Sequence, residues 1–356
     1  MVTRWIAPLA AALAVSLGTG LWAQDTRRDV PLAGQLDEVR RAQQDLEYRL
    51  DQLAKSIDDV LWFQRLGDLA TVDKWRIVGP PDANPESPTA PGALNPVKFY
   101  AYTFVPRERK AGASVPMVVL LHGGVHGDLS TYYVHIVREL VAQGYLVVAP
   151  EYRGSTGYGK TFHQLIDYGG REVDDAHAAT IWALETFDFV DPKRVGLVGW
   201  SHGGMIALLA AFQHPHSYAC AFAGVPVSDL VMRMGYSDKE YEDEFAAPFH
   251  IGKTVREDID EYKRRSPVWH VDKLAIPLRI HTTTNDEDVN VVEVEHLIQA
   301  LKAAGKEFES KVYTDAPGGH GFDRTDTTSG RAARREAWEF LARYLRPPRP
   351  AADRPL

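Results

Sequence analysis

The sequence predicts an α/β protein whose mostly parallel sheet is covered by helices on both faces. Short apolar runs typical of buried strands alternate with segments of helical spacing, which is the pattern of parallel sheets. The 356 residues suffice for one large α/β domain and a smaller segment, and 45% hydrophobic with 25% charged residues is an ordinary globular composition. The expected strands are 117–121, 145–149, 195–198, 219–225 and 278–281, and the expected helices are 132–141, 173–184, 205–212 and 292–303.

Residues 1–23 have the pattern of a secretory signal peptide. Arg4 precedes an uncharged apolar run that ends in small residues at Ala23. A retained membrane anchor is the alternative, because the run is just long enough to span, although Pro8 and the glycines disfavour a spanning helix. We therefore expect a secreted or periplasmic protein without stable membrane insertion after signal cleavage.

Charge and cysteine content exclude some classes of function. The formal net charge of -8 argues against nucleic acid as a partner, because phosphate binding requires a basic face. The single cysteine, Cys220, leaves no internal disulfide, and its apolar neighbours predict a buried core position.

The chain is expected to contain four further parts after the signal. Residues 24–78 are expected to form a helical segment, 79–96 a Pro-rich linker, 97–346 the large α/β domain and 347–356 a disordered tail. In the helical segment, spacings of three and four residues generate a heptad stripe. The stripe either packs on the main domain or forms a coiled coil, which would make a homodimer through the helix at 32–62. Its members are Leu36, Val39, Gln43, Leu46, Leu50, Leu53, Ile57 and Val60.

A candidate nucleophile lies between a predicted strand and a predicted helix. Residues 199–203 read Gly-Trp-Ser-His-Gly, with the strand 195–198 before them and the helix 205–212 after them. This strand–turn–helix context is a nucleophile elbow, in which a strained backbone presents the serine hydroxyl and flanking glycines prevent collisions. The sequence therefore predicts an α/β-hydrolase fold with Ser201 as nucleophile, against the alternative of a structural serine.

A second motif supplies donors for a developing negative charge. The strand 117–121 runs into His122-Gly123-Gly124, and such a loop offers a backbone N–H to the oxygen of a tetrahedral intermediate. The second N–H is expected from His202, after the nucleophile, and each donor is worth about 3–4 kcal/mol of transition-state stabilisation. A glycine turn without catalytic role is the alternative.

The acid and the base are expected downstream, in the order Ser, acid, His. Asp286 follows the strand 278–281 and would lie at the carboxyl edge of the sheet, with Glu287 and Asp288 as rivals. His320 stands between glycines on a loop and can reach over the sheet, whereas His281 and His296 belong to a strand and a helix.

These residues predict acyl transfer without a cofactor or metal. His320 would take the proton of Ser201 during its attack on a carbonyl carbon and return it to the leaving group, while Asp286 fixes the imidazole tautomer. His122, His126, Asp128 and His202 match no metal-ligand spacing.

The sequence resembles the catalytic domain of the prolyl oligopeptidase family, especially its acylaminoacyl-peptidase and dipeptidyl-peptidase branches, over about 97–345. The resemblance implies a triad of Ser201, Asp286 and His320, with the amides of Gly124 and His202 as oxyanion hole. Asn285-Asp286 followed by Val289 favours Asp286 over Asp288. The matching motifs are 122–124, 144–145, 150–159, 169–170, 199–204, 265–267, 285–286 and 319–320.

The sequence also departs from that family. Val125 and Asn290 replace usual prolines, and the region before Val97 is too short for several β-propeller blades of about 40–45 residues each. We therefore expect a peptidase acting on peptides or acyl-amino acids, or a carboxylesterase using the same triad; a hydrolase fold used only for binding is a third possibility. Residues 229–270 lie where such folds insert substrate-covering pieces. Their acidic stretch, within 238–244, is either a solvated helix face or a site for a cationic substrate.

Overall fold

The computed structural model describes residues 32–351 except 84, 86 and 111. The predicted signal peptide, residues 1–23, lies outside this part of the chain. Among the described residues, no helix combines the length and the apolar character needed to cross a membrane. The chain divides into two units, residues 1–44 and 45–356. In the first unit, the described residues are the helical stretch 32–44.

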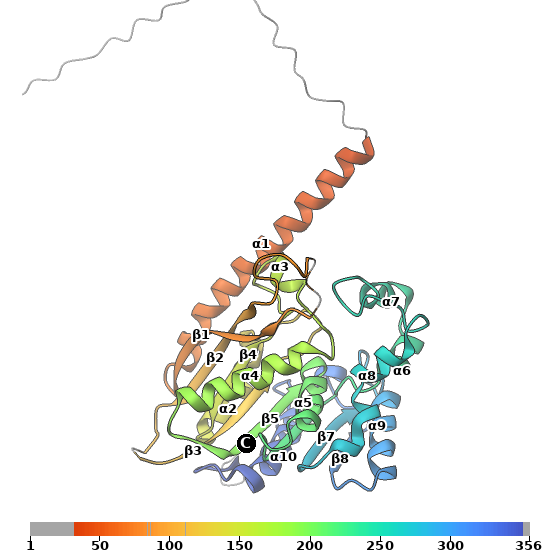
Figure 1. The fold of residues 1–356 in the computed structure, drawn as a ribbon. Helices are drawn as coiled ribbons and strands as arrows, with labels where there is room; N and C mark the ends of the chain where they lie inside the picture. Colours follow the sequence, from red (N-terminus) through yellow and green to blue (C-terminus); the bar gives the residue numbers. More distant parts are fainter. Residues whose placement is uncertain (1–31, 84, 86, 111, 352–356) are drawn as a thin grey trace, which may run out of the picture. The chain divides into compact units, whose positions relative to one another are not determined.

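The described residues form one sheet of eight strands in the order β1-β2-β4-β3-β5-β6-β7-β8 (Figure 1). β1 pairs with β2 and β2 with β4 in antiparallel fashion, and all other pairs are parallel, so the predicted mostly parallel sheet is confirmed. β3 and β4 are buried along their whole length, as expected for central parallel strands. The strands are β1 Ala70–Pro81, β2 Pro96–Pro106, β3 Val115–Leu121, β4 Leu146–Glu151, β5 Val190–Trp200, β6 Cys220–Gly224, β7 Leu278–Thr283 and β8 Glu309–Tyr313.

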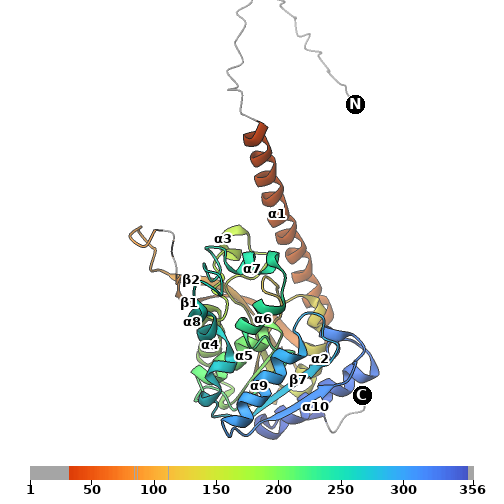
Figure 2. The same cartoon turned by 90° about the vertical axis from the view of Figure 1, so that its right-hand side faces the viewer.

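Helices cover both faces of the sheet, which confirms the predicted layers (Figures 1 and 2). One hydrophobic core joins the sheet to α4 (Arg171–Thr186), α5 (His202–Gln213) and α9 (Val291–Ala303). The other joins it to the end of α1 (Leu32–Leu66), to α2 (Val134–Gln143) and to α10 (Thr328–Leu345). Between β6 and β7, residues 229–270 form the cap segment, which contains α6 (Leu230–Tyr236), α7 (Lys239–Phe245) and α8 (Ile259–Arg265). A short helix, α3 (Lys160–His163), follows β4.

The first two strands correct the predicted domain boundaries. Residues 70–78, expected in the helical segment, belong to β1, and 82–95 connect β1 to its antiparallel neighbour β2 rather than linking two domains. β1 alternates buried positions such as Val72 with exposed or half-buried ones. β1 is an edge strand, paired only with β2, and it carries charged residues. These residues obscure the apolar pattern that identified the inner strands.

The end of the described chain also differs from the expected disordered tail. The Arg349 N–H donates to the Gln143 carbonyl oxygen at 3.1 Å, and the Ala351 N–H donates to the Gln143 side-chain oxygen at 3.1 Å. Pro348 packs against Gly144, whose positive φ of 97° ends α2. Residues 347–351 are therefore held against α2, while 352–356 lie outside the described residues.

The heptad stripe of α1 is not the surface that packs on the sheet. Lys55, Trp62 and Leu66 are buried, and they lie on the side of the helix opposite to the stripe. In the second unit the stripe is exposed: Leu46 is 56% exposed, Leu50 55%, Leu53 58%, Ile57 56% and Val60 66%. Packing on the domain therefore does not account for the stripe.

Candidate active site

Ser201 lies at the turn between β5 and α5 in a strained conformation. Its φ of 58° and ψ of −122° are unusual for a residue with a side chain and cost on the order of 1–3 kcal/mol. The turn is held by the Ser201 N–H, which donates to the Gly224 carbonyl at 3.0 Å. A Cβ at Gly203 would lie 2.2 Å from the Leu121 carbonyl oxygen, so glycine is required there. The predicted strand–turn–helix around Ser201 is thus present, with its backbone strain.

The His122-Gly123-Gly124 loop lies directly beside Ser201. A Cβ built on Gly123 would come within 3.3 Å of the Ser201 Cβ, so the loop approaches the serine as closely as glycine allows. The Gly123 N–H donates to the Tyr133 hydroxyl at 2.9 Å and is therefore engaged. Gly124 has a φ of 83°, and its carbonyl oxygen lies 3.2 Å from His202 Nδ1. The structure thus brings together the two residues predicted as oxyanion donors.

The backbone N–H of His202 is available because His202 is the first residue of α5. The first N–H groups of a helix have no intrahelical acceptor, and the helix dipole adds partial positive charge at this end. Both features favour an anion in front of His202. Tyr133, which fixes the loop from the 3-10 turn Thr131–Tyr133, was missed by the sequence analysis, because no local motif marks a tyrosine whose hydroxyl accepts a distant backbone N–H.

His320 and Asp286 contact each other across the loops that follow β8 and β7. His320 Nδ1 lies 2.9 Å from both carboxylate oxygens of Asp286, whose side chain is fully buried. Because a carboxylate only accepts hydrogen bonds, the proton of the neutral imidazole resides on Nδ1. His320 Nε2 is then left with a lone pair, which is the state required of a general base.

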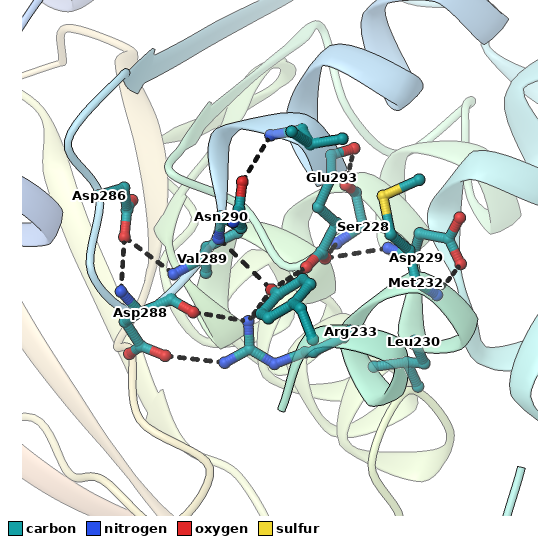
Figure 3. Close-up of polar contacts among 12 residues, drawn as sticks. Ser228, Asp229, Leu230, Met232, Arg233, Asp286, Asp288, Val289, Asn290 and Glu293 are labelled. Atoms are coloured by element: carbon teal, nitrogen blue, oxygen red, sulfur yellow. Dashed lines mark hydrogen bonds and ion pairs between the residues drawn. The ribbon is translucent and has the colours of Figure 1, made fainter. Parts of the chain in front are cut away.

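The structure separates the three candidate acids by the atom of His320 that each one faces. Asp286 faces Nδ1, the Glu287 carboxylate accepts the His320 backbone N–H at 2.9 Å, and Asp288 Oδ2 lies 3.6 Å from Nε2. The hydrogen bond from His320 lowers the pKa of Glu287. Asp286 Oδ1 also accepts the N–H groups of Asp288 and Val289, at 2.9 and 2.8 Å, which closes the acid loop around it (Figure 3).

A charge cluster between the cap segment and α9 supports the acid loop. The Arg233 guanidinium donates to Asp288 Oδ1 at 2.8 Å and to the Asp288 carbonyl at 3.2 Å (Figure 3). Behind it, the buried Glu293 accepts the N–H of Ser228 at 2.5 Å and the hydroxyl of Tyr236 at 2.6 Å. Burial raises the pKa of Glu293. Sequence reasoning missed this cluster, because a charged residue gives no sign of burial until its partners are known.

The serine elbow and the histidine loop are tied by a buried hydrogen bond. The indole N–H of Trp200, next to the serine, donates to Asp323 Oδ2 at 2.8 Å. Both side chains are excluded from solvent. Asp323 follows the 3-10 turn Gly319–Gly321 that carries His320. The bond therefore fixes the loop of the base relative to the loop of the serine.

Comparison with known proteins matches residues 131–347 to the model of the prolyl oligopeptidase family. An uncharacterized peptidase of Bacillus subtilis is 30% identical over 62% of this chain and 33% of its own length. The acylamino-acid-releasing enzyme of Arabidopsis thaliana is 27% identical over 71% of this chain and 34% of its own length. The chain thus spans about a third of the length of these curated relatives.

Solved structures give the same fold. Pyrococcus horikoshii acylaminoacyl peptidase superposes with a TM-score of 0.66 at 20% identity, covering 81% of this chain and 44% of that one. A puromycin-hydrolyzing peptidase of Mycobacterium tuberculosis superposes with a TM-score of 0.64 at 25% identity, covering 78% and 39%. With the family model matching more than half of its residues, the chain belongs to the prolyl oligopeptidase family.

Proposed function

We propose that this chain is a serine hydrolase that cleaves peptide or acyl-aminoacyl bonds through Ser201, Asp286 and His320. The observation that carries the proposal is the contact of His320 Nδ1 with Asp286 at 2.9 Å. The strained backbone of Ser201 and the Trp200–Asp323 hydrogen bond, which ties the serine turn to the histidine loop, support it. The names of the relatives, acylamino-acid-releasing enzyme and peptidase, support the substrate class. Because the chain spans a third of their length, the substrate is part of the proposal.

The proposed reaction uses each of these groups in a defined role. Ser201 Oγ attacks the carbonyl carbon while its proton passes to His320 Nε2, and the carbonyl oxygen becomes an oxyanion facing the amides of Gly124 and His202. His320 then gives the proton to the leaving amine, and the carbon–nitrogen bond breaks to leave an acyl-enzyme. Water, deprotonated by His320, attacks the ester and releases the acid and the serine.

A carboxylesterase using the same groups is the second candidate. The described residues ahead of the sheet form the helix α1 rather than the strands of propeller blades, so they supply no element of that kind to select peptides. Ester cleavage needs no protonation of an amine and is chemically easier.

Hydrolysis assays distinguish the two candidates. The purified mature protein would be given short-chain p-nitrophenyl esters and, in parallel, aminoacyl and acetyl-aminoacyl p-nitroanilides, each with Ser201→Ala as the blank. Serine-dependent cleavage of the anilides is expected. Turnover of esters alone would replace the peptidase by an esterase, and equal rates in Ser201→Ala would refute both.

We also propose that α1 joins two copies of the chain in a coiled-coil dimer. The supporting observation is the exposed apolar stripe, whose spacing is that of a coiled-coil seam and whose opposite face already packs on the sheet. A second copy of the same helix offers the matching seam. Gln43 would meet its equivalent in the partner and fix the register.

Export is proposed from the sequence alone. A basic start followed by an apolar run to Ala23 favours secretion or delivery to the periplasm. N-terminal sequencing of the protein from the extracellular or periplasmic fraction should begin near Gln24; a start at Met1 would contradict cleavage.

A further inference from the structure

Two histidines and a glutamate from distant parts of the sequence meet outside the proposed triad. His126 Nε2 and His250 Nε2 lie 3.0 Å apart, and the Glu244 carboxylate lies 3.9 Å from His250 Nε2. One ligand atom from each residue can be chosen so that all three lie within 4.8 Å of one another. His126 follows the His-Gly-Gly loop, whereas Glu244 and His250 belong to the cap segment.

The surroundings of His126 orient its ring so that Nε2 faces His250 Nε2. His126 Nδ1 lies 2.8 Å from the Gly154 carbonyl oxygen, so Nδ1 carries the proton and Nε2 has a lone pair. A backbone carbonyl that accepts the second ring N–H is also the usual orienting partner of a metal-bound histidine.

His250 is held rigidly in an apolar environment. Only 1% of it is exposed, and its Nδ1 has no hydrogen-bond partner among the described residues. The rings of Phe245 and Phe249 each lie 5.1 Å from its ring, centroid to centroid. Its Nε2 points at His126, and packing determines that direction.

We propose that His126, His250 and Glu244 bind one divalent transition-metal ion, with Zn²⁺ as the best fit. Two imidazole nitrogens bound at about 2.0–2.1 Å with tetrahedral angles would be about 3.3 Å apart, and the observed 3.0 Å is close to this value. Two imidazoles and one carboxylate suit Zn²⁺, whereas Ca²⁺ and Mg²⁺ prefer oxygen ligands alone. The fourth position would be occupied by water.

The ion would connect the cap segment to the oxyanion loop. His126 lies two residues after Gly124, and the Gly127 N–H donates to the Gly124 carbonyl at 3.2 Å. Glu244 is on α7, and its side chain is 46% exposed, which gives the ion a route from solvent. Metal binding would thus restrain the cap over the proposed site.

Titration of the EDTA-treated full chain with ZnCl₂ in a calorimeter tests the proposal. We expect saturation at one Zn²⁺ per chain. His126→Gln and Glu244→Gln should each weaken Zn²⁺ binding by at least about tenfold. Removing a residue that only orients a ligand already lowers metal affinity by about that factor, and removing the ligand itself should lower it at least as much. Asp243→Asn, at an exposed residue of the same helix that pairs with Lys239, and His216→Gln, at an exposed histidine elsewhere, are the matched controls and should bind as the wild type does.

Thermal unfolding provides a second readout that does not depend on catalysis. Zn²⁺ should raise the unfolding temperature of the wild type and of both controls, and should not raise that of His126→Gln. Glu244→Gln alters a partly exposed side chain and keeps the test valid if His126→Gln folds poorly. Absence of saturable one-to-one binding in the wild type, or wild-type affinity in Glu244→Gln, would overturn the proposal, whatever the outcome of the hydrolysis assays.

Discussion

Lys55 of α1 lies 2.8 Å from Glu151 at the end of β4, and both side chains are almost completely buried. The Lys55 ammonium also donates to the Leu129 carbonyl at 2.5 Å and lies 3.2 Å from Asp128. The second oxygen of Glu151 lies 3.4 Å from His122 Nε2. The N-terminal helix therefore supplies the cation that neutralises a buried carboxylate behind the His-Gly-Gly loop.

Replacing Lys55 by methionine should destabilise the protein strongly. The methionine fills the space but leaves Glu151 as an unpaired buried charge, a change that typically costs about 3–5 kcal/mol. Urea unfolding gives the free energy of unfolding. Lys98→Met, at an exposed lysine of β2, is the control and should stay within about 0.5 kcal/mol of wild type. A similar small effect of both variants would mean that the Lys55–Glu151 ion pair does not contribute to the stability of the fold.

The Lys55–Glu151 ion pair also predicts how the free energy of unfolding depends on pH. Burial alone would raise the pKa of Glu151, but Lys55 and His122 outweigh it and lower that pKa below its usual 4.5. A lowered carboxyl pKa contributes stability that is present above pH 4.5 and is lost as the pH falls below it. In Lys55→Met, burial should dominate and raise the pKa of Glu151. The contribution of Glu151 to the free energy of unfolding should then increase, rather than decrease, as the pH falls. Urea unfolding should be measured between about pH 3 and pH 7, a range that includes the ordinary pKa of a glutamate. The free energy of unfolding should fall less steeply with acid in Lys55→Met than in wild type.

Removing the proposed nucleophile should abolish turnover without unfolding the protein. Ser201→Ala is expected to lower kcat by about four to six orders of magnitude, because the residual rate depends on the oxyanion donors and binding alone. Circular dichroism and the unfolding temperature should be nearly unchanged. Activity within about tenfold of wild type in a folded Ser201→Ala protein would eliminate Ser201 as the nucleophile.

The ranking of two aspartates tests the orientation of His320. Asp286→Asn places an amide N–H against Nδ1 and favours the wrong tautomer, which costs about 10⁴-fold in kcat in comparable triads. Asp288→Asn keeps a side-chain oxygen for Arg233 and does not touch Nδ1, so a much smaller loss is expected. Steady-state kinetics of both variants measure the difference. If Asp288→Asn lowered kcat more than Asp286→Asn did, Asp288 rather than Asp286 would be the acid that orients His320.

The sequence predicted those parts of the fold and site that local patterns encode. The inner strands from β3 to β7 are short apolar runs, and Ser201, Asp286 and His320 follow strands or stand between glycines. β1 was missed because its charged, half-solvated face hides the strand period. Lys55–Glu151 and Arg233–Asp288 could not be predicted, because each pair joins residues far apart in the chain and burial of a charge depends on the partner.

The exposed stripe of α1 predicts that a single charged substitution within it changes the oligomeric state. Leu50 and Leu53 are 55% and 58% exposed, and in a coiled coil both would enter the seam. Leu50→Asp and Leu53→Asp should therefore convert a dimer into a monomer while leaving the catalytic domain folded, since neither side chain packs on the sheet. Light scattering coupled to size exclusion gives the molar mass. Gln44→Asp introduces the same charge on the same helix outside the stripe and should remain dimeric; a monomeric wild type would remove the dimer proposal.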